Sequence, residues 1–142
     1  MGLWVYIRFS AILLVVIGAC FEPLGPQAQP PIGWIALLVI FAFCPIALVI
    51  VLGFQRVNPY SAGAWHRPSW TTNLFNFREP IQFFYFGAFV SMAQGVVILC
   101  RIAVTGAPFY VEALVPLAMG LGIWLGVQMT VVLFRSKFSH SM

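Results

Sequence analysis

The sequence predicts an all-α integral membrane protein with four transmembrane helices, the last two packed as a tight antiparallel hairpin. Of the 142 residues, 62% are hydrophobic and only 7% are charged. The mean hydropathy is +1.00. A soluble domain usually carries about 25% charged residues, so the bilayer is the expected solvent. Four spans of about 20 residues each use most of the chain, and we interpret residues 1–142 as a single membrane domain.

The predicted spans are the four longest apolar segments, which in chain order are residues 3–21, 32–54, 80–101 and 112–134. We expect helices because lipid offers no hydrogen-bond partner to the open edge of a strand. Two of the connections are short. The remaining connection, residues 55–79 between the second and third spans, is longer and holds most of the polar residues of the chain.

The first span carries a basic residue near its start, Arg8, followed by "FSAILLVVIGAC". We interpret it as an ordinary span whose Arg8 extends its charged head to the membrane surface. The alternative is a secretory signal, or a lipoprotein cleavage box in which Cys20 is lipidated. Cleavage would leave the topology of the other three spans unchanged.

The second span has a proline in its interior, Pro45. Proline removes one helical hydrogen bond, frees the carbonyl of Phe41 and is expected to bend the helix. Neighbouring helices commonly satisfy such a freed group in a membrane. The alternative is a hinge in a transporter.

The third and fourth spans each carry small residues at every fourth position, a pattern typical of closely packed membrane helices. These residues are Gly87, Ser91 and Gly95 in the third span, and Ala118, Gly122 and Gly126 in the fourth. In an antiparallel hairpin, residues at equal depth have a constant sum of residue numbers, because both helices rise equally per residue. The stripes therefore predict three pairs: Gly87 with Gly126, Ser91 with Gly122, and Gly95 with Ala118.

The same register makes two further predictions about this hairpin. It places the turn within "TGAP", which is turn chemistry. It also pairs Arg101 with Glu112, two opposite charges at the outer end of the hairpin. Pro116 either begins the fourth helix or kinks it and shifts the pairing.

Basic residues predict the orientation of the chain. With both termini and residues 55–79 on one side, that side holds six of the seven Lys and Arg residues, all except Arg101. We therefore expect both termini in the cytoplasm. The compact loops, and the absence of a glycosylation sequence, suit a bacterial inner membrane.

The long connection is the candidate surface for a partner or a site. Its candidate residues are Trp65, His66, Arg67, Trp70, Arg78 and Glu79. The tryptophans are typical of a belt at headgroup level, and Pro80 is expected in the first turn of the third helix. The alternative is a polar site in which His66 accepts a proton near neutral pH.

Two glutamines fall well inside spans, away from the span ends: Gln94 and Gln128. The register separates their depths by roughly 13 Å, so we expect no bond between them. We interpret Gln94 as a polar contact between helices. The alternative is a contact with a transported solute.

The residue inventory offers no catalytic set, metal site or cofactor motif. The chain has no Asp, and its three glutamates fall at span ends. The three cysteines lack metal-ligand spacing and are expected to be buried free thiols. The basic residues are scattered, which argues against nucleic-acid binding.

These observations favour a non-catalytic membrane protein that acts by packing in the bilayer, as an accessory subunit of a larger membrane complex or as a homo-oligomer. A small oligomeric channel or transporter for a neutral or small solute is the second hypothesis. A membrane enzyme with its site in the long connection is the third.

Overall fold

The structure is a computed structural model that describes residues 2–23, 33–57, 65–70, 80–134 and 138–139. Within these residues its regular secondary structure is helical apart from two two-residue strands. Among the same residues it contains four helices long and apolar enough to cross a membrane, consistent with an integral membrane protein. The helices are α1 (Leu3–Phe21), α2 (Trp34–Val57), α3 (Pro80–Thr105) and α4 (Val115–Leu133), with a 3₁₀ helix, η2 (Val111–Leu114), directly before α4.

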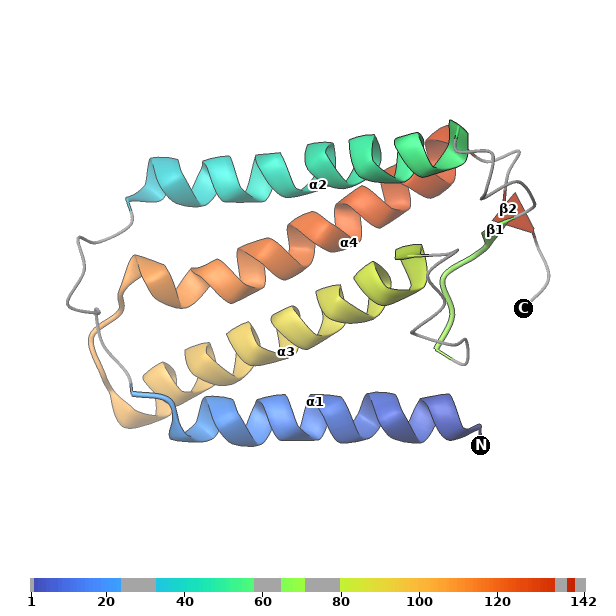
Figure 1. The fold of residues 1–142 in the computed structure, drawn as a ribbon. Helices are drawn as coiled ribbons and strands as arrows, with labels where there is room; N and C mark the ends of the chain where they lie inside the picture. The colour runs from blue at the N-terminus through green and yellow to red at the C-terminus, as the bar shows by residue number, and fades with distance from the viewer. Residues whose placement is uncertain (1, 24–32, 58–64, 71–79, 135–137, 140–142) are drawn as a thin grey trace.

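The four helices lie side by side in a row, in the order α2, α4, α3, α1 (Figure 1). The central helix α4 packs equally against α2 and α3, whereas α1 packs mainly against α3. Both termini lie at one end of the row, and the turn between α3 and α4 lies at the other (Figure 1). Within the described residues, α1 and α2 are therefore the two outer helices.

Turn chemistry explains the boundary between α3 and α4. The third helix continues past Arg101 to Thr105 and ends at Gly106, whose φ of 70° is a conformation that glycine adopts without steric cost. Pro116 lies in the first turn of α4, where its missing N–H removes no helical bond. It therefore starts the helix and does not kink it.

Glycines allow α4 to approach both of its neighbours. A β-carbon added at Gly120 would lie 2.8 Å from the Ala88 carbonyl oxygen and 2.8 Å from the Met92 amide nitrogen, both in α3. Ala88 is itself fully buried. At these distances a methyl group has no space, so the backbones of α3 and α4 touch here.

Two of the three residues in the stripe predicted to face α3, Gly122 and Gly126, face α2 instead, which corrects two of the predicted pairs. A β-carbon at Gly126 would lie 2.9 Å from the α-carbon of Pro45, and one at Gly122 would lie 3.1 Å from the Phe41 carbonyl oxygen. That oxygen is the one freed by Pro45. The glycines are needed where the proline-bearing face of α2 comes closest, and spacing alone does not reveal which neighbour a stripe faces.

The α3 side of the predicted register is closer to what the structure shows. The Ser91 hydroxyl donates a 2.6 Å hydrogen bond to the Pro116 carbonyl oxygen. A β-carbon at Gly95 would lie 2.7 Å from the amide nitrogen of Leu117, one residue from the predicted partner Ala118. By contrast, nothing lies within 4 Å of a β-carbon added at Gly87. The predicted contact of Gly87 with Gly126 is therefore wrong.

Buried side chains form two clusters, one toward each end of the row. The first joins α2, α3 and α4 through Leu48, Leu52, Ile81 and Val127. The second joins α1, α3 and η2 through Ala19, Ile98, Ile102 and Ala113. The helix α1 therefore contributes to the second of these hydrophobic clusters, at the end away from the termini.

A short parallel strand pair lies at the end of the row that holds the termini. β1 (Trp65–His66) pairs with β2 (Phe138–Ser139), with Trp65 opposite Phe138. This pairing attaches the C-terminal residues to the long connection between α2 and α3 (Figure 1).

Candidate functional site

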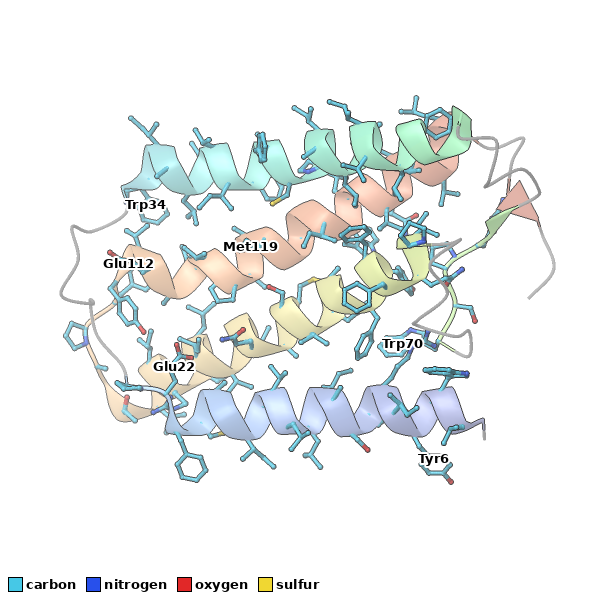
Figure 2. The ribbon with its side chains drawn as sticks, in the orientation of Figure 1. Tyr6, Glu22, Trp34, Trp70, Glu112 and Met119 are labelled. Atoms are coloured by element: carbon cyan, nitrogen blue, oxygen red, sulfur yellow. The ribbon has the colours of Figure 1, made fainter. Side chains whose placement is uncertain are left out.

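The candidate site is a cluster of one arginine and several aromatic rings between α1 and α3, at the end of the row that holds the termini. At its centre is Trp70, which lies between the two helices (Figure 2). The centroid of its ring lies 5.1 Å from that of Phe89 and 6.2 Å from that of Phe86, both in α3. On the other side it stacks on the ring of Phe9 in α1, with 6.5 Å between the centroids. Such contacts stabilise beyond the area that they bury. Trp70 therefore packs between α1 and α3, and its place at headgroup level stays a prediction.

Arg8 of α1 points into this cluster. It is 1% exposed, so it does not extend to the surface as predicted. Its guanidinium carbon lies 6.0 Å from the Trp70 ring centroid and 5.9 Å from that of Phe86. A cation over an aromatic face is attracted by the ring, most strongly where water is excluded. The aromatic rings of the cluster therefore stabilise a charged side chain that is buried between two helices.

Gln82 fixes the chain segment that carries Trp70. Its side chain is 1% exposed. Its Oε1 accepts a 3.2 Å bond from the Ser69 backbone N–H, and its Nε2 donates a 3.3 Å bond to the Arg67 carbonyl oxygen. One amide thus satisfies a donor and an acceptor of a segment without helical bonds of its own. Sequence reasoning missed Gln82 because its role depends on the path of the connection.

We expect Gln82→Leu to release this segment. The substitution removes both of these partly buried bonds, which contribute about 0.5–1.5 kcal/mol each. Hydrogen exchange at the Ser69 amide should rise strongly in the variant. Gln94→Leu is the matched control, and we expect it to leave Ser69 protected. Equal protection in wild type and Gln82→Leu would contradict the assignment.

A second arginine attaches α1 at the opposite end of the row. The Arg101 Nη1 donates hydrogen bonds to the carbonyl oxygens of Ala19, at 2.5 Å, and Glu22, at 2.7 Å. These groups lie at the end of α1, where carbonyls lack helical partners and a cation is favourable. The Arg101 side chain therefore binds the C-terminal end of α1. An ion pair with Glu112, labelled in Figure 2, stays a prediction.

Arg101→Met should therefore loosen the end of α1. We expect faster hydrogen exchange in residues 20–23, since bonds to a charged group contribute about 1.5–3 kcal/mol. Glu112→Gln distinguishes this role from the predicted ion pair. If Glu112→Gln reproduced the loss of protection at α1, the ion pair would be the main function of Arg101.

The remaining residues predicted for the long connection are only partly described. Arg78 and Glu79 lie outside the described residues. Trp65 and His66 are described as backbone in β1. Arg67 is half-buried and, as described above, is held through its carbonyl oxygen.

The glutamine and cysteine side chains of the helices differ in how far they are buried. Gln128 borders a shallow groove on the surface of α4, beside Met129 and Val132. The three cysteines are free, but Cys20 and Cys100 are exposed and only Cys44 is half-buried, so the predicted burial is wrong for two of them. Among the described residues, no group of three or more His, Cys, Asp or Glu side chains could hold a metal ion.

The class that these features define is a membrane protein of four apolar helices in a row, with arginine contacts fixing the first helix at both ends. Comparison of the chain with protein-family models, curated proteins and solved structures finds no match. The argument for function therefore rests on the geometry.

Proposed function

We propose that the chain is a non-catalytic membrane subunit whose helices pack against other membrane-protein chains, as an accessory or assembly subunit or in a homo-oligomer. The observation that carries the proposal is the lack of hydrogen-bond partners at the side chains of Gln94 and Gln128 within the described residues. Both are half-buried within spans, and in the described part of the chain neither side chain has a hydrogen-bond partner. Hydrocarbon cannot satisfy an amide, whereas a polar group on a neighbouring helix can.

The row of helices supports the same proposal. A closed bundle would give each helix two neighbours, but α1 packs mainly on α3 and α2 mainly on α4. Large apolar side chains such as Leu14 and Ile35 are 70% and 80% exposed on these outer helices. The arginine contacts hold α1 in place at its two ends while most of its length stays open to other chains.

The proposed setting is a bacterial cytoplasmic membrane with both termini in the cytoplasm. It is supported by the sequence, in which six of the seven basic residues fall near the two termini or within residues 55–79. Basic residues are retained on the cytoplasmic side during insertion.

Substitution of the glutamines tests the proposal. We expect Gln128→Leu to reduce the assembled fraction after gentle detergent extraction, because an interhelical amide bond contributes about 0.6–2 kcal/mol. Met129→Leu, one position along the same groove, is the matched control and should assemble like wild type. An unchanged assembly in both Gln94→Leu and Gln128→Leu would remove the main support.

A small-solute channel is the second candidate, since unpartnered glutamines could also line a polar path in an oligomer. Flux through reconstituted protein separates the two. A channel loses flux in Gln94→Leu while the oligomer stays intact, whereas an assembly subunit loses the oligomer.

A further inference from the structure

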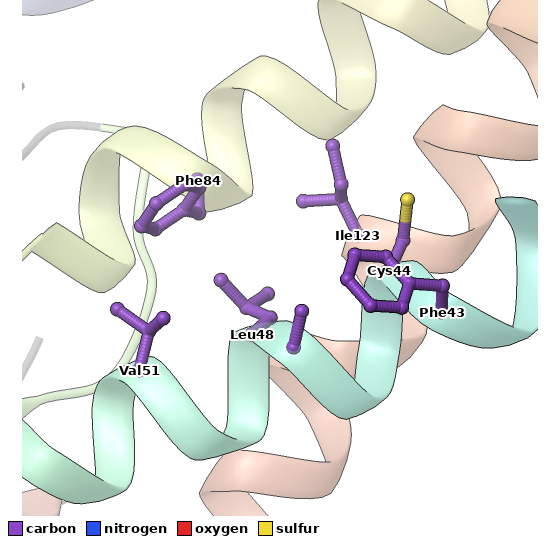
Figure 3. Close-up of a pocket in the computed structure, with 7 residues that line it drawn as sticks. Phe43, Cys44, Leu48, Val51, Phe84 and Ile123 are labelled. Atoms are coloured by element: carbon purple, nitrogen blue, oxygen red, sulfur yellow. The ribbon is translucent and has the colours of Figure 1, made fainter.

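One face of the central helix α4 points away from both of its neighbours. Gly122 and Gly126 face α2, and Gly120 faces α3. Ile123 lines an apolar groove between α2 and α3, so this side of α4 is flanked by both helices (Figure 3). Leu125 is two residues farther along, which is about 160° around the helix, and it is exposed. The outer face of α4 therefore lies opposite the groove.

The outer face of α4 carries four residues with the spacing of a seam between two parallel helices. We call them the α4 seam: Leu121, Leu125, Gln128 and Val132. Consecutive members are four, three and four residues apart. This alternation keeps one line of side chains against a partner helix over several turns, as in parallel coiled coils and in many membrane helix pairs. The three apolar members are all exposed, so the described residues leave the seam open.

Gln128 is the polar member of the α4 seam. Its side chain is half-buried, and no hydrogen bond satisfies it within the described part of the chain. A glutamine amide has two N–H donors and one oxygen acceptor, and hydrocarbon satisfies neither kind of group. The amide is therefore most stable against a polar group at the same depth on another helix.

A second copy of the chain supplies such a group by symmetry. Two copies inserted in the same direction, and related by a two-fold axis along the membrane normal, bring identical residues to equal depth. Gln128 then meets Gln128. Two amides satisfy each other because each both donates and accepts, whereas an ammonium only donates and a carboxylate only accepts. The helix α4 contains no charged residue, so two identical faces meet without like-charge repulsion.

We propose that two copies of the chain pair through the α4 seam, with their two Gln128 amides hydrogen-bonded to each other. This inference rests on the proposed function and selects the homo-oligomer from its alternatives. The two α4 helices are parallel in the pair. Layers of Leu121 and Leu125 lie on one side of the amide pair, and a layer of Val132 lies on the other.

Cysteine crosslinking locates the contact between the copies. One cysteine is introduced, as Leu125→Cys in the seam or as Ile46→Cys on α2. Ile46 is the matched control because it is exposed and lies at a similar depth, where Gly126 of α4 meets Pro45. Under copper-phenanthroline oxidation in membranes of the expression host, we expect Leu125→Cys to form a covalent dimer and Ile46→Cys to stay monomeric. The native thiols are first removed by Cys20→Ala, Cys44→Ala and Cys100→Ala.

A dissociation constant measures the contribution of the amide pair. Energy transfer between copies labelled at their N-termini, followed on dilution with lipid, needs no substitution in α4 for the wild-type measurement. We expect Gln128→Leu to raise the dissociation constant about tenfold, which is about 1.4 kcal/mol and within the range for amide bonds between membrane helices. Met129→Leu, outside the seam, should leave it unchanged.

The other outcomes overturn the pairing in distinguishable ways. A crosslink in Ile46→Cys but not in Leu125→Cys would place the contact on α2. An equal rise of the dissociation constant in Gln128→Leu and Met129→Leu would show that the amides do not pair. A fixed complex with other chains, in which Leu125→Cys links no two copies, would overturn the pairing and leave the proposed function in place. Wild type without energy transfer and with the mass of a monomer would contradict both.

Discussion

Gly120→Ala should destabilise the helix row by about 1–3 kcal/mol, the usual cost of overpacking a close interface. Its new methyl group would meet the backbone of Ala88 and Met92 at 2.8 Å. A flexible side chain could move aside, but these atoms move only if α3 and α4 separate along their contact. The free energy of unfolding in detergent, from denaturant titration followed by circular dichroism, measures the effect.

The control for this prediction is Gly87→Ala. A methyl group there meets nothing within 4 Å, and alanine is the better helix former by about 1 kcal/mol. Gly87→Ala should therefore be neutral or stabilising. Gly126→Ala should destabilise through its contact with Pro45 of α2. Equal losses in Gly87→Ala and Gly126→Ala would favour the stripe pairing over the observed packing.

Trp70→Ala should destabilise the protein by about 3–5 kcal/mol, the usual cost of truncating a large packed aromatic residue. The change leaves a space between α1 and α3 and removes one of the two rings that cover the Arg8 guanidinium. We expect α1 to separate from α3 at this end. Distances between spin labels on the two helices should lengthen and broaden.

Two comparisons isolate the role of Trp70. Trp34→Ala removes a ring that is 57% exposed and should cost much less. Arg8→Met in the Trp70→Ala background should recover part of the stability lost in Trp70→Ala. The reason is that the double variant no longer holds a buried charge whose covering ring has been removed. Additive effects of Arg8→Met and Trp70→Ala would show that the ring and the cation do not interact.

The helical class follows from the sequence because hydropathy over a span depends on composition alone. The four apolar segments coincide closely with α1 to α4, and Pro116 begins a helix as its chemistry allows. Which faces touch is a different question. Gly122 and Gly126 do lie on one face of α4, but α4 has two neighbouring helices. The spacing of the glycines does not indicate which of the two this face contacts.

The cluster around Trp70 was less accessible to sequence reasoning. Its members come from α1, the long connection and α3, and they meet only because the connection folds back between the helices. Gln82 carried one available signal, a polar side chain within the first turn of an apolar helix. Arg8 was misplaced because an arginine near a helix end usually reaches the surface, and the aromatic rings that retain it here are distant in sequence.

The mass of the particle obtained by gentle extraction tests the central claim, assembly with other membrane-protein chains or with further copies of this chain, most directly. Native mass spectrometry of the protein should show a fixed complex with other chains or a defined homo-oligomer. The complex should weaken in Gln128→Leu and persist in Met129→Leu. A stable monomer of about 15.8 kDa plus lipid, in detergents that preserve known membrane complexes, would contradict the proposal.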